Sequence, residues 1–314
     1  MDVLPEPIRY DEERHALRCA ACDARYEPTS DGMRRAIDCC HTLEEVDRDA
    51  IPVCQVPLKL SRKERAASEY TDRQLTVLQA VYTASQQRFD TALEFDLLSD
   101  SMKLLVEYLG LDDDALQELL DDGMLRHDGD TPHKLYTVTA GGRDEIGERH
   151  REGIAHGDGE GDLAESSLHA MMVTGGAQYI EQEYAANPDS PMVEAISYHP
   201  VGDGRRLDAA GLDADGEVIV TLEAERLNHN LRKDVPADFD AMAACEPAEA
   251  LWVARNRDAA HDLLEALNDP QDGEPRVEKT YSENSPPRQW KIETAGFTEM
   301  LTLGRLRSRI EEDA

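Results

Sequence analysis

The stretch Arg205–Arg226, RRLDAAGLDADGEVIVTLEAER, carries the clearest fold signal in this chain of 314 residues. Asp215-Gly216 is a strong two-residue turn signal between two segments in which apolar and polar side chains alternate. A loop made of these two residues, or of the four residues 214–217, places Asp208 opposite Glu223. The stretch therefore predicts a β-hairpin with two acidic side chains facing each other.

The same register places Arg206 opposite Glu225, and the period of two brings all four side chains to one face. Like charges directly opposite each other destabilise a strand pair unless something neutralises them. Three neutralising partners are open: a metal ion, a shared proton or the neighbouring arginine. A metal ion would indicate a nuclease-type site, whereas the arginine would indicate a salt-bridged strand pair.

The composition is strongly acidic, with 66 Asp and Glu residues against 33 Lys and Arg residues, a formal net charge of -33. This composition resembles that of proteins from salt-loving archaea, whose surfaces carry hydrated carboxylates. At molar salt the Debye length is about 3 Å, so repulsion between this protein and DNA acts only at contact range. The acidity therefore does not exclude a nucleic-acid partner, although counterion release would contribute little to binding.

The N-terminus, MDVLPEPIRYDEE, is polar and acidic, which is unlike a signal peptide. No apolar run approaches the roughly 20 residues that span a membrane. We therefore expect a cytoplasmic protein with no membrane partner. Five of the six cysteines precede residue 55, which indicates a local site rather than a disulfide framework.

Changes in composition predict a multidomain α+β and α/β protein. Residues 1–57 form a cysteine-bearing module, and a basic connector, 58–68, leads into a helical part with a β-ribbon at 69–149. A glycine-rich, charged linker at 151–163 precedes an α/β domain at 164–304. The alternation of helix and strand signals in the last segment predicts a helix, three strands, a helix, a strand and a helix.

The cysteines suit a tetrahedral zinc site, because a predicted β-knuckle and the end of a short helix each offer soft ligands. Thr29 or Ser30 would cap that helix. The knuckle followed by a helix resembles small zinc fingers in general. Reduced structural cysteines without a metal remain the alternative. The preferred ligands are Cys19, Cys22, Cys39 and His41, with Cys40 or Cys54 as substitutes, because three adjacent residues cannot all point at one metal.

The helical part resembles the winged-helix domain of archaeal and bacterial regulators, through helices broken at Gly110 and Asp122-Gly123 and the ending YTVTAGGR at residues 136–143. The resemblance implies DNA binding through the third helix, residues 112–122, but that helix is acidic. Contact through the wing and the connector, or use of the domain for dimerisation or docking of a protein, fits the charges better. The candidate DNA contacts are Arg62, Lys63, Arg65, Arg126, His133 and Lys134.

The predicted order of the C-terminal elements resembles the core of restriction-endonuclease-like nucleases. That resemblance makes Asp208 and Glu223 ligands of a Mg²⁺ ion that would activate water and neutralise the scissile phosphate. The position that holds lysine in such nucleases is Glu225 here, and Lys233 could replace that lysine from the following helix. We therefore take Asp208, Glu223, Glu225 and Lys233 as the candidate catalytic set.

A winged helix followed by a nuclease-like domain with the sequence Glu223-Ala-Glu225-Arg226 resembles the replication-relaxation family of plasmids and mobile elements. The resemblance implies a DNA-associated accessory protein of replication or transfer, with a degenerate nuclease-like domain. A metal-dependent endonuclease or nickase, and a protein-interaction adaptor that does not touch DNA, are the alternatives. We expect structural zinc, with Mg²⁺ needed only by the enzyme alternative, and a homodimer is compatible with the winged helix.

Overall fold

The computed structural model describes residues 4–87, 89, 93, 95–129, 133–148, 165–188, 190–202, 204–225, 230–290 and 292–313. The predicted linker at 151–163 and Arg226 lie outside the described residues. The chain divides into two compact units, the first built from Met1–Glu152 with Leu163–Leu168, and the second mainly from His169–Ala314. Among the described residues, no helix has both the length and the apolar character needed to cross a membrane.

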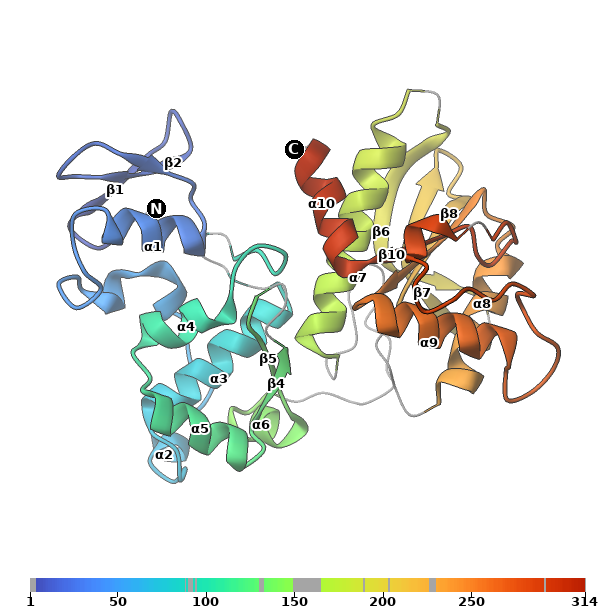
Figure 1. The fold of residues 1–314 in the computed structure, drawn as a ribbon. Coiled ribbons are helices and arrows are strands. Elements are labelled where there is room, and N and C mark those ends of the chain that lie inside the picture. Colours follow the sequence, from blue (N-terminus) through green and yellow to red (C-terminus); the bar gives the residue numbers. More distant parts are fainter. Residues whose placement is uncertain are drawn as a thin grey trace. The chain divides into compact units, whose positions relative to one another are not determined.

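The first unit combines a three-stranded antiparallel sheet, a set of helices and a two-stranded ribbon (Figure 1). The residues before the helical part form β1 (Ile8–Asp11), β2 (Ala16–Cys19), β3 (Arg25–Tyr26), α1 (Ser30–Asp38), η1 (Arg48–Ala50), η2 (Pro52–Cys54) and α2 (Arg62–Arg65). They are followed by α3 (Asp72–Ser85), α4 (Met102–Leu109), α5 (Asp113–Asp121), β4 (Leu125–Gly129), β5 (Leu135–Val138) and α6 (Ala140–Glu145).

Local sequence signals set the ends of these helices. Helix α3 begins at a capping box, in which the Thr71 hydroxyl accepts from the Gln74 N–H and the Gln74 side chain accepts from the Thr71 N–H. Helix α4 ends at Gly110, whose φ of 65° is left-handed and favours glycine. Asp112 then caps α5. The predicted break at Gly110 is thus an αL helix end.

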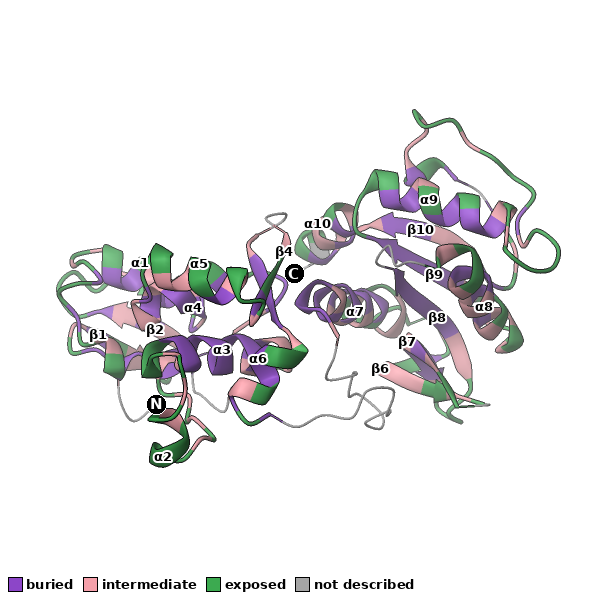
Figure 2. Ribbon diagram, turned by 90° about the horizontal axis from the view of Figure 1, so that it is seen from below, coloured by how far each residue is buried: buried purple, intermediate pink, exposed green. Residues whose placement is uncertain are grey.

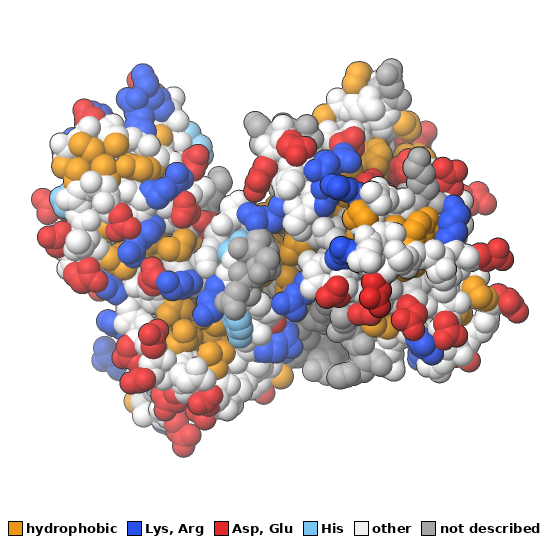
Figure 3. Space-filling view, viewed as in Figure 1, with side chains coloured by type: hydrophobic (Ala, Val, Ile, Leu, Met, Phe, Trp, Pro, Cys, Tyr) orange, Lys and Arg blue, Asp and Glu red, His pale blue; other side chains and the backbone are white. Residues whose placement is uncertain are grey.

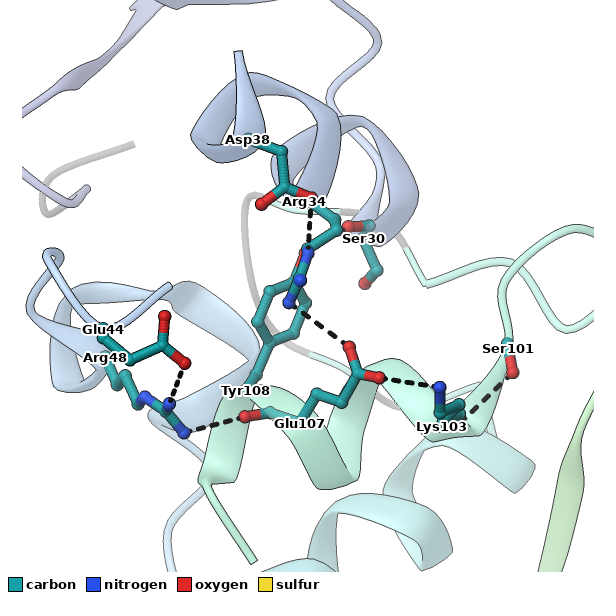
Figure 4. Close-up of polar contacts among 9 residues, drawn as sticks. All are labelled: Ser30, Arg34, Asp38, Glu44, Arg48, Ser101, Lys103, Glu107 and Tyr108. Carbon is teal, nitrogen blue, oxygen red and sulfur yellow. Dashed lines mark hydrogen bonds and ion pairs between the residues drawn. The ribbon is translucent and has the colours of Figure 1, made fainter. Parts of the chain in front are cut away.

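The N-terminal module packs directly on α4, so that it shares a core with the helical part rather than forming an isolated appendage (Figure 4). The buried Tyr108 hydroxyl donates to the Ser30 carbonyl oxygen at 2.6 Å. The Arg34 guanidinium meets the Glu107 carboxylate at 3.2 Å, and Arg48 donates to the Glu107 carbonyl oxygen at 2.9 Å. These contacts join residues that are about 60 to 80 positions apart in the sequence. All of them are made by Glu107 or Tyr108 in the last turn of α4.

The second unit is a five-stranded mixed sheet with helices on both faces. Its elements are α7 (Ser167–Ile180), the π-helical turn η3 (Glu181–Ala185), β6 (Met192–Val201), β7 (Arg205–Asp213), β8 (Val218–Glu225), α8 (Leu231–Ala244), β9 (Glu249–Ala254), α9 (Arg257–Asn268), η4 (Pro287–Gln289), β10 (Glu299–Thr302) and α10 (Leu303–Asp313). The strand order is β10-β9-β8-β7-β6, with β6, β7 and β8 antiparallel and β8, β9 and β10 parallel. This order includes the predicted succession of a helix, three strands, a helix, a strand and a helix.

The predicted hairpin is present, but its turn differs from both loops that the sequence suggested. Asp213 and Glu217 flank a three-residue loop, in which the Asp213 N–H donates to the Glu217 carbonyl oxygen at 3.0 Å and Gly216 takes a φ of 83°. This loop alone would shift the register by one residue. A bulge between the Leu212–Val218 and Gly211–Val220 pairs restores it, and Ala209 pairs with Leu222 as the predicted register requires.

The two faces of this sheet bury different helices, as Figure 2 shows with α7 and α10 on one side and α8 and α9 on the other. Trp252 of β9 and Phe239 of α8 belong to the core cluster on the α8 and α9 face. On the other face α7 comes so close that a Cβ atom on Gly176 would lie 2.8 Å from the Leu222 methyl groups. Helices therefore cover both faces of the sheet, which explains why β8 is buried from Val220 to Glu225.

Candidate functional site

Four cysteine sulfur atoms of the first unit lie close enough together to hold one metal ion. The Sγ atoms of Cys19, Cys22, Cys39 and Cys40 all lie within 4.8 Å of one another. The Cys22 and Cys39 sulfurs are 3.2 Å apart, and those of Cys39 and Cys40 are 3.8 Å apart. A Zn–S bond of about 2.3 Å in a tetrahedron implies sulfur separations of about 3.8 Å, so the spacing suits zinc.

Two local structures bring these sulfurs together. After β2, the Asp23 N–H donates to the Cys19 carbonyl oxygen at 2.9 Å, and the resulting turn carries Cys22 beside Cys19. Helix α1 is capped by the Thr29 hydroxyl, which accepts from the Gly32 N–H, and it ends at Asp38. The predicted knuckle and capped helix are both present, and the sulfur pair after the helix faces the pair on the knuckle.

The structure changes the preferred ligand set. Cys40 belongs to the sulfur cluster, whereas His41, the preferred fourth ligand, does not. The helix ends before Cys39, and the turn that follows lets two adjacent sulfurs reach the same cluster. Cys54 is at the end of η2, where burial raises the pKa of its thiol to about 12, and it is not part of the cluster.

The donor set fits zinc in its chemistry as well as in its spacing. Hydrogen bonds with the Cys22 and Cys39 sulfurs raise the pKa of the Cys40 thiol to about 12. Four neighbouring thiolates would repel one another, and a divalent cation removes that repulsion while displacing the protons. A zinc ion held by four cysteines keeps no position for water or substrate, so its role would be structural.

In the second unit, the predicted meeting of Asp208 with Glu223 takes place where β7 and β8 stop pairing. The paired register ends at Ala209–Leu222, and the Ala224 N–H then donates to Asp208 Oδ2 at 2.8 Å. The Glu223 side chain hydrogen-bonds Asp208, which lowers the pKa of Asp208 and raises that of Glu223. Of the three neutralising partners that the sequence left open, this arrangement favours a shared proton.

Two residues from other elements complete this group, which we call the carboxylate cluster: His169 of α7, Asp208 of β7, Glu223 and Glu225 of β8 and Asp238 of α8. His169 Nε2 lies 3.1 Å from Asp208 Oδ2. Glu223 and Glu225 are 7% and 9% exposed and stand beside Trp252 and Ala254 of β9, on the sheet face that α8 covers. The cluster is therefore at the carboxyl end of β8, between the sheet and helices from both sides.

Burial and mutual repulsion decide which of these acids keep protons. Burial and the charges of Asp238 and Asp208 raise the pKa of Glu225 to about 8. Burial and the charges of Asp208 and Asp234 raise the pKa of Asp238 to about 7. Burial alone would raise the pKa of Asp208, but the charge and hydrogen bond of His169 hold it below its usual value. Asp208 is therefore the member of the cluster that ionises most readily.

The backbone opposite Asp208 is irregular. Tyr198 of β6 stands between the pairs Ser197–Ala209 and His199–Leu207, directly across from Asp208, and its φ is 56°. A positive φ on a bulky aromatic residue costs about 1–3 kcal/mol and is found mainly at functional sites. Arg206 places its guanidinium 5.1 Å from the centre of the Tyr198 ring, so this arginine packs toward the edge strand β6.

The lysine that the nuclease resemblance requires is not beside these acids. Lys233, the proposed replacement, is exposed on α8, and the same helix instead contributes the charges of Asp234 and Asp238. Among the described residues, Asp208, Glu223 and Glu225 are not a group whose ligand atoms all lie within 4.8 Å. As folded, the cluster therefore does not bring these three carboxylates around a single position for a metal ion.

Several predicted DNA contacts of the first unit are engaged within the protein. Arg126 is exposed but pairs with Asp128 at 2.9 Å, and His133 bonds to the Leu97 carbonyl oxygen at 2.8 Å. Lys134 lies 5.8 Å from the centre of the Tyr136 ring. On α2, Arg65 pairs with Asp72 at 2.8 Å, whereas Arg62 and Lys63 are exposed.

Sequence reasoning missed His169 and Asp238 as members of the cluster. Asp238 follows Asp234 by one helical turn, on the helix after the hairpin. That i,i+4 spacing was the available signal, because it predicts two acids on one face of the helix after the hairpin. His169 carried no local signal, since only the packing of α7 against the sheet brings it to Asp208.

Comparisons of this chain with protein-family models, with curated proteins and with solved structures found no match.

Proposed function

We propose that this protein is a DNA-associated accessory protein of a plasmid or other mobile element, with a nuclease-like second unit that binds but does not cut. The observation that carries the proposal is the carboxylate cluster, in which Asp208 pairs with His169 and burial shifts the neighbouring acids toward the neutral form. A site that has the carboxylates of a nuclease, with Glu225 where such a nuclease has lysine, suits a retained scaffold.

The topology of the second unit supports the nuclease-like part of this proposal. Helix α7, the antiparallel strands β6, β7 and β8, helix α8 and the parallel strand β9 follow the order expected of a restriction-endonuclease-like core. Asp208 and Glu223 come from the second and third strands of that core, as the resemblance requires. The fold alone does not establish a reaction, because similar folds carry different functions.

The charges argue against metal-dependent cleavage. Phosphodiester hydrolysis on carboxylate sites uses ionised ligands and a metal ion that neutralises the phosphate. Here burial and the neighbouring acids raise the pKa of Glu223 well above its usual value and that of Glu225 to about 8. In the metal-free cluster these carboxyl groups are therefore shifted toward the neutral form, and a metal ion would have to displace their protons.

The first unit supplies the proposed contact with nucleic acid. Helices α3, α4 and α5, the ribbon β4–β5 and α6 follow the order of elements in a winged helix. Four cations are the donors available to phosphate groups. Arg62 and Lys63 are exposed on α2, and Arg126 and Lys134 belong to the ribbon and its loop. Because molar salt screens charges beyond about 3 Å, these donors would act by direct hydrogen bonds rather than by long-range attraction.

Two assays in molar KCl test the two parts of the proposal, which are DNA binding and the lack of DNA cleavage. A fluorescence-anisotropy titration with duplex DNA should show saturable binding that weakens in the double variant Arg62→Ala, Lys63→Ala. The matched control is Arg9→Ala, which removes an exposed cation from β1. Supercoiled plasmid incubated with Mg²⁺ or Mn²⁺ should stay intact. Unchanged affinity in the double variant would reject α2 as the contact, and nicked plasmid would replace the scaffold with an enzyme.

The endonuclease alternative rests on one observation, the side-chain hydrogen bond that joins Asp208 with Glu223 at the end of the hairpin. If the protein cuts DNA, plasmid cleavage should rise steeply above pH 8, because the acids must lose their protons first. Loss of that cleavage in Asp208→Asn would identify the cluster as its source.

The adaptor alternative rests on helix α5, whose exposed face is acidic. Asp112, Asp114, Glu118, Asp121 and Asp122 line a shallow groove there, and acidic side chains gather over this end of the first unit in Figure 3. Such a face would repel DNA phosphates at contact and would suit a basic protein segment. If DNA binding is undetectable while an oligo-lysine peptide binds and the double variant Asp114→Asn, Asp121→Asn releases it, the adaptor function replaces the proposed one.

A further inference from the structure

The first unit contains a cavity of about 290 Å³ between α3 and the segment that precedes α2. Val56, Pro57, Tyr82 and Phe89 provide its apolar walls. This volume is close to the lower end of the range for small-molecule sites, which are mostly apolar with a few placed polar groups. All of its lining residues belong to the first unit, and none of them is a member of the cysteine cluster or of the carboxylate cluster.

Polar groups from three segments meet at the cavity. Gln79 of α3 is 4% exposed, and its Nε2 donates to Glu148 Oε1 at 3.0 Å. Glu148, which follows α6, is 5% exposed, and its other carboxylate oxygen, Oε2, pairs with the Lys59 ammonium. All three residues line the cavity, so its polar part combines two buried side chains, those of Gln79 and Glu148, with the exposed ammonium of Lys59.

One atom in this arrangement has no partner. The buried Oε1 of Gln79 accepts no hydrogen bond from the residues that the structure describes, although Nε2 of the same amide is paired. A buried acceptor left unsatisfied costs about 1–3 kcal/mol, and such groups usually indicate a water molecule or a ligand. Because Gln79 lines a cavity with room for more than a water molecule, the missing donor can come from a ligand.

The charges of the cavity select a neutral ligand. Lys59 neutralises Glu148, so a cationic ligand would meet the ammonium group and an anionic ligand would meet the carboxylate. We propose that this cavity binds a small, neutral, planar amide, whose N–H donates to Gln79 Oε1 and whose ring packs between Tyr82 and Phe89. The Lys59 ammonium is the donor available to the carbonyl oxygen of the same amide. This site is independent of the proposed DNA-related function.

The first test uses the native protein and three probes of the same shape. In ligand-observed NMR titrations in molar KCl, benzamide should bind saturably. N,N-dimethylbenzamide, which has no N–H, and benzamidine, which is a cation at neutral pH, should each bind about tenfold more weakly or not at all. Equal binding of the dimethyl compound would overturn the assigned hydrogen bond, and tighter binding of benzamidine would overturn the neutral class. The absence of saturable benzamide binding would overturn the site itself.

The second test identifies the residue. Gln79→Met keeps the length of the side chain and removes the acceptor, and it should weaken benzamide binding about tenfold. Gln117→Met is the matched control, since Gln117 is an exposed glutamine on α5, outside the cavity, and should leave the affinity unchanged. Circular dichroism and the melting temperature establish that both variants fold, and the three-probe comparison decides the question if Gln79→Met does not. Equal affinities of the folded Gln79→Met variant and the native protein would overturn the assignment.

Discussion

Asp208 Oδ2 is 3.1 Å from His169 Nε2, and the same oxygen accepts the Ala224 N–H at 2.8 Å. One carboxylate oxygen thus joins helix α7 to the strand β8 at the point where β7 and β8 stop pairing. The two donors keep Asp208 ionised among acids that burial drives toward the neutral form. This division of protons within the carboxylate cluster determines how the second unit should respond to pH and to substitution.

The stability of the second unit should fall as the pH rises from about 4 to about 8. An unfolded glutamate has a pKa of about 4.3, whereas the pKa of Glu225 in the folded protein is about 8. The folded state therefore binds more protons across this range, and the free energy of unfolding decreases with pH by up to about 1.4 kcal/mol per unit for each such group. Asp238 adds to this loss up to a pH of about 7. Guanidinium denaturation at constant molar KCl measures this loss of stability. A stability that rises with pH in this range would contradict the raised pKa values of Glu225 and Asp238.

The variant Glu225→Gln should be more stable than the native protein at pH 8 and close to it at pH 5. The amide has nearly the same shape and stays neutral, so it removes the repulsion by Asp238 and Asp208 that the ionised form meets. We expect a gain of roughly 1–3 kcal/mol in the free energy of unfolding at pH 8. Glu217→Gln, at the exposed hairpin turn, is the control and should change neither value. Equal gains at both pH values would show that the titration of Glu225 is not the cause.

The zinc stoichiometry should distinguish Cys40 from His41. Purified protein is expected to contain about one zinc per chain, and Cys40→Ser should lose most of it, because one of four sulfurs is removed. His41→Asn and Cys54→Ser should keep the metal, since neither residue belongs to the cluster. Elemental analysis of dialysed protein provides the measurement. Retention of zinc by Cys40→Ser together with its loss from His41→Asn would restore the ligand set that the sequence favoured.

The contact of α7 with β8 should not tolerate a methyl group. A Cβ atom on Gly176 would lie 2.8 Å from both methyl groups of Leu222, so Gly176→Ala must displace the helix or the leucine. We expect a loss of about 1–3 kcal/mol in the free energy of unfolding. Gly304→Ala is the matched control, because Gly304 is in helix α10 with open space around its Cβ position. That control should be neutral or stabilising by up to about 1 kcal/mol. Similar effects of the two variants in thermal denaturation would contradict the close packing.

The hairpin shows how well local sequence patterns predict a strand register and a turn. Alternation and the Asp215-Gly216 signal predicted the strand register correctly at Ala209–Leu222, although the loop has three residues. The error at the turn and the bulge cancel, and the different helices packed on the two faces explain why. A register slip of one residue would turn the apolar side chains of β8 toward the wrong layer, so packing restores the register where the turn does not.

The ligands of the candidate sites were less predictable. The sequence indicated Cys19, Cys22 and Cys39 through their spacing, but the choice between Cys40 and His41 depends on where α1 ends. A one-residue change in the end of a helix rotates the following side chains by about 100°, which no local pattern resolves. The role predicted for Lys233 stays a prediction, and its side chain is exposed on α8.

The sequence by itself determined the features that depend on neighbours within a few residues. These are the helix caps at Thr29 and Thr71, the αL end at Gly110 and the facing of Asp208 with Glu223. Only the tertiary structure decided which residues complete each site, because His169 and Asp238 reach the cluster from separate helices. Their effect on protonation depends on distance and burial, and both arise when the helices pack on the sheet.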